Sequence, residues 1–183
     1  MAAHATLDEP SAWVARWGTL VAPGARVLDL ACGSGRHTRF FAALGATVTA
    51  VDRDVEAVAA LAALPGVVAR VADLEGAPWP FAGLSFDAIV VTNYLHRPLF
   101  PAIVAALAPD GVLVYETFMA GNERFGRPSN PAFLLVPGEL LDAVAGLSVL
   151  GFEQGEVQRP KPAVMQRVCA VRGDCTRRRI EAP

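Results

Sequence analysis

The chain has 183 residues, of which 53% are hydrophobic, and a formal net charge of −2. This length suits one domain with a buried core, and the slightly negative charge argues against binding nucleic acid by charge alone. No apolar run is long enough to span a membrane, and the first residues lack the pattern of a signal peptide. The cysteines Cys32, Cys169 and Cys175 have no metal-binding spacing, so we expect a reducing, cytoplasmic setting.

The chain opens with a predicted helix over residues 8–20, in which Trp13, Val14 and Trp17 recur at helical spacing. The tryptophans read as core residues, although a leading helix could also bring them to a ligand. A short apolar run over 26–30 then predicts a parallel strand that is buried on both faces.

A glycine turn follows this strand, and it leads into a helix expected over 35–44. Gly33 and Gly35 carry no Cβ, so the backbone can turn sharply there and approach a ligand closely. The free N–H groups at the start of the helix point into the same crevice. A second strand, over 46–51, leads to Asp52, whose carboxylate suits the two hydroxyls of a ribose. The pattern predicts a nucleoside cofactor site.

Asp29 narrows the choice of cofactor. It stands four residues before Gly33, and Thr38 occupies the place where a dinucleotide site has its third glycine. A carboxylate at this point would repel a pyrophosphate and attract an ammonium or sulfonium group. An NAD(P)-dependent oxidoreductase remains the first alternative, and a plain strand-helix-strand core with turn glycines is another.

The run Asp-Leu-Ala-Cys-Gly-Ser-Gly over 29–35 resembles the first motif of class I S-adenosylmethionine-dependent methyltransferases. The resemblance implies S-adenosyl-L-methionine as the cofactor. It places Asp29, Gly33 and Gly35 at the methionine end and Asp52 at the ribose. The predicted cofactor site is completed by residues at the ends of the first, second and fourth strands: Ala31, Arg53 and Asn93.

A third helix is expected over 54–64, with Asp54 as its N-cap, and a third strand over 67–72. Asp73 and Leu74 follow that strand. In the family that the chain resembles, a polar group at this point meets the adenine amino group, and Leu74 would pack against the ring. Asp73 could equally cap the short turn after it.

The fourth strand, over 86–92, brings a group of polar side chains to the carboxyl edge of the sheet. His96 is the leading candidate for a general base, because the ordinary pKa of histidine lies near neutrality. It could instead cap the helix expected over 99–107. Tyr94 is a second catalytic candidate, or it packs against the substrate. We expect His37, early in the second helix, at the surface.

A tight turn at 109–111, typical of the same family, precedes a fifth strand over 112–116. Glu116 ends this strand and is either a third candidate base or the partner of an arginine. Residues 117–136 then show no clear period, and a segment of this length predicts a lid, a binding loop or a structural loop. Arg97, Arg124 and Arg127 are candidates for binding an anionic substrate.

A fifth helix over 137–145 and two strands over 148–157 and 164–172 finish the domain. The predicted fold is a Rossmann-like α/β doubly wound sheet of about seven strands, mostly parallel with a C-terminal antiparallel hairpin, with helices on both faces. This architecture resembles the class I methyltransferases over about residues 27–172. We expect one domain over 1–175 and a flexible tail over 176–183.

The resemblance implies methyl transfer to a small-molecule acceptor by in-line displacement, which requires no metal because the methyl group is already activated. The Gly-Ser-Gly-Arg-His run, together with Pro-Gly-Glu-Leu after the long loop, is similar to the tellurite-resistance type methyltransferases. A non-catalytic protein that binds the same cofactor is the second alternative. Such a protein would keep the cofactor-binding residues, but the loop after its fourth strand would have no catalytic function.

Overall fold

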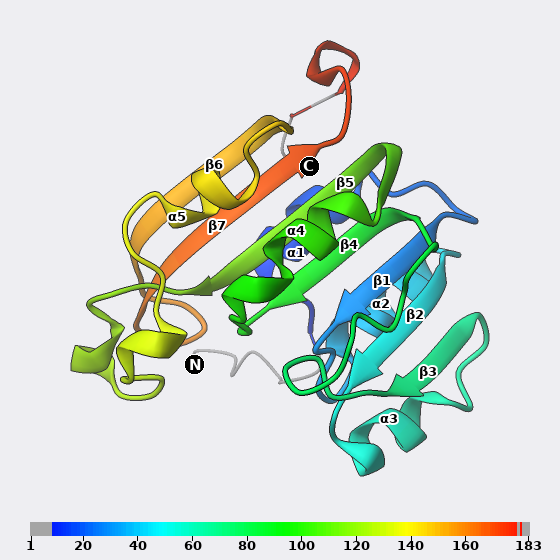
Figure 1. Cartoon of the computed structure of the whole chain (residues 1–183), viewed down its shortest axis with the longest axis horizontal. Coiled ribbons are helices and arrows are strands. Elements are labelled where there is room, and N and C mark those ends of the chain that lie inside the picture. Colours follow the sequence, from blue (N-terminus) through cyan, green and yellow to red (C-terminus); the bar gives the residue numbers. More distant parts are fainter. Residues whose placement is uncertain (1–8, 179, 181–183) are drawn as a thin grey trace, which may run out of the picture.

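The computed structural model describes residues 9–178 and residue 180. Its centre is a seven-stranded sheet with the order β3-β2-β1-β4-β5-β7-β6 (Figure 1). The strands are β1 Arg26–Leu30, β2 Thr47–Asp52, β3 Val67–Val71, β4 Phe86–Thr92, β5 Leu107–Phe118, β6 Ser148–Val157 and β7 Ala163–Val171. Strands β1 to β5 are parallel, and β7 is antiparallel to both of its neighbours. The predicted fold class is confirmed.

Helices cover both faces of this sheet, and short 3₁₀ turns connect several elements (Figure 1). The helices are α1 Ala12–Gly18, α2 Arg36–Ala43, α3 Val55–Leu61, α4 Phe100–Ala105 and α5 Glu139–Ala143. Two large apolar clusters fill the space between sheet and helices, one under α1 and α2 and the other under α4 and α5. No helix within the described residues is both long and apolar enough to span a bilayer.

Successive residues of a strand point to opposite faces of the sheet, and β1 shows the consequence for the site. Leu28 and Leu30 pack in the cluster under α4 and α5, whereas Val27 packs in the cluster under α1 and α2. Asp29 shares its face with Val27, so its side chain points toward α2. Because both faces are buried, the strand sequence alone does not say which side a polar residue takes.

The leading helix is shorter than expected, because Ser11 caps it by accepting a hydrogen bond from the Val14 N–H group. Trp13 and Trp17 are 3% and 2% exposed. Their rings meet edge to face with centroids 5.6 Å apart, and the Trp13 indole N–H donates to the Val168 carbonyl. Both tryptophans are therefore core residues, as the helical spacing favours.

Strand β5 begins earlier than the apolar run suggests, because Leu107 already pairs with Phe86 of β4, and the turn that follows bonds to the residue after β7. The Asp110 N–H group bonds to the Arg172 carbonyl, and the Arg172 N–H group bonds to the Gly111 carbonyl. At the other end of the chain, residues Cys175–Arg177 form a 3₁₀ turn that Asp174 caps. Residues 179 and 181–183 of the predicted flexible tail lie outside the described residues.

Candidate active site

A cavity of about 310 Å³ lies at the carboxyl edge of the parallel strands, the edge to which the arrowheads of β1 to β5 point in Figure 1. Ligands bind at this edge in open α/β sheets. The wall is formed by the segments that follow β1, β2, β3, β4 and β5. Its residues are Ala31, Asp52, Arg53, Ala72, Asp73, Leu74, Glu75, Asn93, Tyr94, Leu95, Thr117, Phe118, Pro128 and Phe133.

The loop after β1 turns through left-handed backbone conformations, with φ values of 55° at Ala31, 52° at Gly33 and 80° at Gly35. A Cβ placed on Gly33 would meet no atom within 4 Å, so this backbone faces open space. A Cβ on Gly35 would lie 2.4 Å from Leu61 Cδ2. Gly33 thus leaves room beside the cavity, whereas Gly35 permits close packing against α3.

Asp52 joins this loop to the end of β2. Its two carboxylate oxygens accept the N–H groups of Gly33 at 2.8 Å and Asp54 at 3.0 Å. Asp52 also lines the cavity, and Arg53 beside it is exposed on the rim. Each carboxylate oxygen has a second lone pair, so the group can also accept hydrogen bonds from ligand hydroxyls.

Asp29 does not share the cavity wall with Asp52. Its carboxylate is 1% exposed and accepts a 2.6 Å hydrogen bond from the Thr38 hydroxyl of α2. Burial raises the pKa of Asp29 to about 6. Asp29 thus holds α2 behind the loop and does not line the cavity, and the predicted contact with the methionine end of a cofactor stays a prediction. This bond also gives Thr38 a role where a dinucleotide site has glycine.

Asp73 caps the turn after β3, which is one of the two roles that the sequence allows, and the contact with adenine stays a prediction. Asp73 lines the cavity, and its carboxylate accepts the Glu75 N–H group at 2.9 Å. Hydrogen bonds from the backbone of Glu75 and Gly76 hold the pKa of Asp73 below its ordinary value. Leu74, 7% exposed, adds an apolar surface beside it.

Strand β4 delivers Asn93 and Tyr94 to the cavity wall. Asn93 has a φ of 54°, and the Tyr94 carbonyl accepts the Tyr115 hydroxyl at 2.8 Å. Desolvation and the nearby charges of Glu75 and Asp73 raise the pKa of the Tyr94 phenol. His96 is half-buried two residues further on and is not part of the wall.

Glu116, predicted as a possible base, lies on the opposite face of β5 from Tyr115 and is 3% exposed. Its carboxylate pairs with the Arg167 guanidinium at 3.3 Å, and burial raises the pKa of Glu116. The alternative interpretation, a partner for an arginine, is the one that the geometry shows. Glu116 has no access to the cavity wall.

His37 is 1% exposed, so the expectation of a surface histidine is wrong. Its Nε2 accepts the Ser11 N–H group at 3.2 Å, and its Nδ1 lies 3.3 Å from the Thr92 hydroxyl. An accepting Nε2 leaves the ring proton on Nδ1, which therefore donates to Thr92. Burial lowers the pKa of His37 to about 3. The neutral ring ties the start of α1 to α2 and β4.

The post-β5 segment, residues 119–138, forms the far wall of the cavity through Pro128 and Phe133, next to Phe118 at the end of β5. Hydrogen bonds hold the segment to neighbouring elements at several positions. Leu135 exchanges backbone hydrogen bonds with Phe118 and Ala120. These contacts describe a fixed wall, which favours the structural alternative over a lid.

Two buried amides fix the post-β5 segment to β7. The side chain of Asn122, 2% exposed, donates to the Pro128 carbonyl and accepts the Val164 N–H group. The side chain of Gln166, 0% exposed, donates to the Val136 carbonyl and accepts the Leu140 N–H group at 2.6 Å. Neither residue was recognised as important from the sequence, because their partners lie far along the chain.

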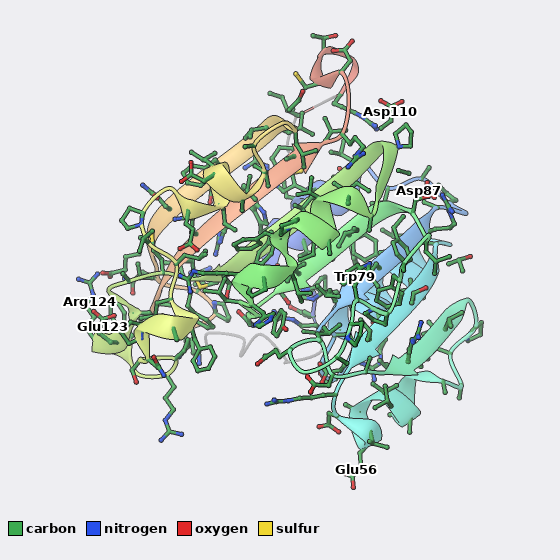
Figure 2. All side chains as sticks on the ribbon, in the orientation of Figure 1. Glu56, Trp79, Asp87, Asp110, Glu123 and Arg124 are labelled. Carbon is green, nitrogen blue, oxygen red and sulfur yellow. The ribbon has the colours of Figure 1, made fainter. Side chains whose placement is uncertain are left out.

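None of the three arginines predicted to bind substrate lines the cavity. Arg97 pairs with Glu139 at 2.6 Å and donates to the carbonyls of residues 132 and 134. Arg124 pairs with Glu156 at 2.9 Å. Figure 2 shows Arg124 at the outer end of the post-β5 segment, at the edge of the molecule. Arg127 is exposed. The expectation of an anionic substrate therefore loses its supporting residues.

Comparisons with known proteins agree with this geometry. Residues 27–111 match the family described as a methyltransferase domain. A 105-residue stretch is 41% identical to a ubiquinone biosynthesis O-methyltransferase from Xanthomonas campestris pv. campestris (strain B100), covering 52% of this chain and 44% of that protein. The match thus spans less than half the length of the relative.

Solved structures support the fold. TehB from Haemophilus influenzae superposes with a TM-score of 0.72 at 19% identity, over 86% of this chain and 60% of that chain. An S-adenosylmethionine-dependent methyltransferase from Mesorhizobium loti superposes with a TM-score of 0.66 at 23% identity, over 88% and 99% of the two chains. The sequence match to the methyltransferase domain family thus lies over residues 27–111, and most of the chain has the fold of solved S-adenosylmethionine-dependent methyltransferases.

Proposed function

We propose that the protein transfers a methyl group from S-adenosylmethionine to a small-molecule acceptor. The observation that carries the proposal is the cavity at the carboxyl edge, which is lined by the carboxylate of Asp52, and this carboxylate also accepts the N–H group of Gly33 in the glycine turn. The O-methyltransferase named among the relatives supports an acceptor of low molecular weight. Because the chain matches less than half of that protein, the cavity provides the second support for a small acceptor.

The residues on the wall fit this cofactor. Asp52 has lone pairs for the ribose hydroxyls, and Leu74 and Asp73 supply an apolar surface and a polar group for the adenine. S-adenosylmethionine brings a methyl group that is already activated by its bond to a sulfonium centre. The task of the protein is to hold the acceptor in line and exclude water. Such positioning supplies on the order of 7–11 kcal/mol in favourable cases.

His96 is the general base in this proposal, for acceptors whose nucleophilic atom carries a proton. It lies outside the cavity wall, but it is close enough for its charge to help lower the pKa of Asp73, which is on the wall. Glu116 is committed to Arg167, and the pKa of Tyr94 is raised, which leaves its phenol protonated at neutral pH. General-base catalysis contributes roughly 10²–10⁴-fold. Replacing His96 with alanine should therefore lower turnover by roughly 10²-fold or more while S-adenosylhomocysteine binds as tightly as before. Unchanged turnover would remove His96 from the mechanism.

The cofactor is tested by calorimetric titration of the protein with S-adenosylhomocysteine and, separately, with NADH. Binding of the first ligand and not the second supports the proposal, and the reverse supports an oxidoreductase. A panel of thiols, amines, phenols and chalcogen oxyanions, assayed with a methyl-labelled donor, then separates an enzyme from a cofactor-binding module. Binding without transfer to any member of the panel would favour the module.

A cytoplasmic location is part of the same proposal. Its support is that Cys32, Cys169 and Cys175 are all free thiols, and two of them are buried. Disulfides form mainly in oxidising compartments. The net charge of −2 also supports a small-molecule partner over nucleic acid.

A further inference from the structure

The two ends of the cavity differ in chemical character. The end formed by the segments after β2 and β3 is polar and carries Asp52, Arg53, Asp73 and Glu75. The end formed by β5 and the post-β5 segment carries Phe118, Pro128 and Phe133. Phe133 lines the cavity yet is 49% exposed. A half-exposed aromatic ring at the mouth of a cavity offers apolar surface that a ligand can cover.

This apolar end is built before any ligand arrives. Arg97 donates two hydrogen bonds to Glu139, at 2.6 and 3.0 Å, and two more to backbone carbonyls on either side of Phe133. Its four bonds fix the turn that carries the ring. A preformed wall reduces the ordering cost of binding, so apolar contact there contributes directly to affinity.

The charges around the cavity disfavour an anion. The wall carries three acids and one arginine, so acidic side chains outnumber basic ones there. Arg97 and Arg124 are engaged by Glu139 and Glu156, and Arg127 lies outside the wall. Among the described residues, no cation faces the apolar end. A cationic cofactor suits the acidic end, and the remaining space suits a molecule without charge.

We propose that the acceptor is an uncharged small molecule with an apolar body, and that Phe133 determines this specificity by packing against it. The inference rests on the proposed function, because it assigns the acceptor end of the same cavity. Phe125 provides a matched control. It lies in the same segment, is 40% exposed, and packs against Arg124 and not the cavity.

The test compares two probes that share a naphthalene body and differ in charge, 2-naphthol and 2-naphthoate, titrated by calorimetry into the full chain saturated with S-adenosylhomocysteine. We expect 2-naphthol to bind about ten-fold more tightly than 2-naphthoate. Phe133→Ala should weaken 2-naphthol binding about ten-fold, and Phe125→Ala less than two-fold. Arg124→Gln and Arg127→Gln should change neither affinity.

Three results would overturn the inference. The first is tighter binding of 2-naphthoate, with a loss in Arg124→Gln or Arg127→Gln. The second is an equal effect of the two phenylalanine variants. The third is binding of neither probe by a protein that does bind S-adenosylhomocysteine. Failure to bind S-adenosylhomocysteine at all would instead contradict the proposed function, so the two failures are distinguishable.

Discussion

The two halves of the sheet hold the cavity in different ways. Around β1 and β2 the wall is made by short-range features: a glycine turn, and the carboxylate of Asp52 bonded to the N–H groups of Gly33 and Asp54. Around β5 and β7 the wall is held by side chains whose partners are distant in sequence. Arg97 and Glu139 are 42 residues apart, and Asn122 and Val164 are also 42 apart.

Because of this difference, we expect substitutions in the two halves to have different effects on ligand binding. At the cofactor end, one carboxylate is bonded to backbone N–H groups 2 and 19 residues away, within a single strand-turn-helix-strand unit. The acceptor end depends on a few side-chain bonds, so it can change shape through substitutions that leave the cofactor end untouched. The comparison predicts that variants of one half change cofactor binding and variants of the other change acceptor binding.

The largest expected effect is on stability, and it compares alanine substitutions at the two glycines of the loop after β1. Gly35→Ala should destabilise the protein by about 3 kcal/mol, because the new methyl group overlaps Leu61 at a positive φ. Gly33→Ala should cost only about 1 kcal/mol, because the same methyl group meets open space. Urea denaturation measures both. Equal losses would show that Gly33 is also a packing position.

Asp52→Ala should weaken S-adenosylhomocysteine binding by about 100-fold, since it removes the acceptor for ribose hydroxyls and frees the Gly33 N–H group. Calorimetry gives the affinity. Asp54→Ala is the control, because Asp54 caps α3 through the N–H groups of Glu56 and Ala57. It should cost about 1 kcal/mol of stability and change affinity little. Comparable affinity losses in both variants would remove the special role of Asp52.

Arg97→Gln should disturb the other half alone. The Glu139 side chain is 15% exposed, and without its partner it loses two charge-assisted hydrogen bonds. We expect 2-naphthol affinity to fall about ten-fold and S-adenosylhomocysteine affinity to stay within about three-fold. Arg124→Gln, which breaks a more exposed pair, serves as the control. A loss of cofactor affinity in Arg97→Gln would break the separation between the halves.

The smallest effect concerns pH. The pKa of Asp29 is about 6 in the folded protein against an ordinary value of 3.8, so the folded state binds more protons between these values. Its contribution to stability is complete below pH 3.8 and is lost as the pH rises through about 6. Asp29→Asn should therefore stabilise the protein by on the order of 1 kcal/mol at pH 8, because the amide keeps a bond to Thr38 without a buried charge.

Thermal unfolding from pH 4 to pH 8 measures this difference. It should shrink toward pH 4, where the wild-type carboxyl is protonated. The titration of His37 occurs in both proteins and cancels in the comparison. A pH-independent difference would mean that burial does not raise the pKa of Asp29.

The sequence predicts the fold well, and it also predicts several of the residues that line the cavity, for a physical reason. The strands β1, β4 and β6 begin and end where the apolar runs do, and the glycine turn and Asp52 lie within one local unit. The face of the sheet to which the Asp29 side chain points could not be predicted, because both faces of β1 are buried. The roles of Glu116 and Arg97 depend on Arg167 and Glu139, which only folding brings near.

The bond between Ser11 and His37 has a practical consequence. It fixes the first described residues beside α2, whose N-terminus faces the cavity edge. The turn Cys175–Arg177 lies at the opposite end of the sheet, where Arg178 donates to the Asp110 carbonyl (Figure 1). A purification tag or a fluorescent fusion partner is therefore best attached at the C-terminal end, because the described part of the chain begins at the edge of the sheet that carries the cavity.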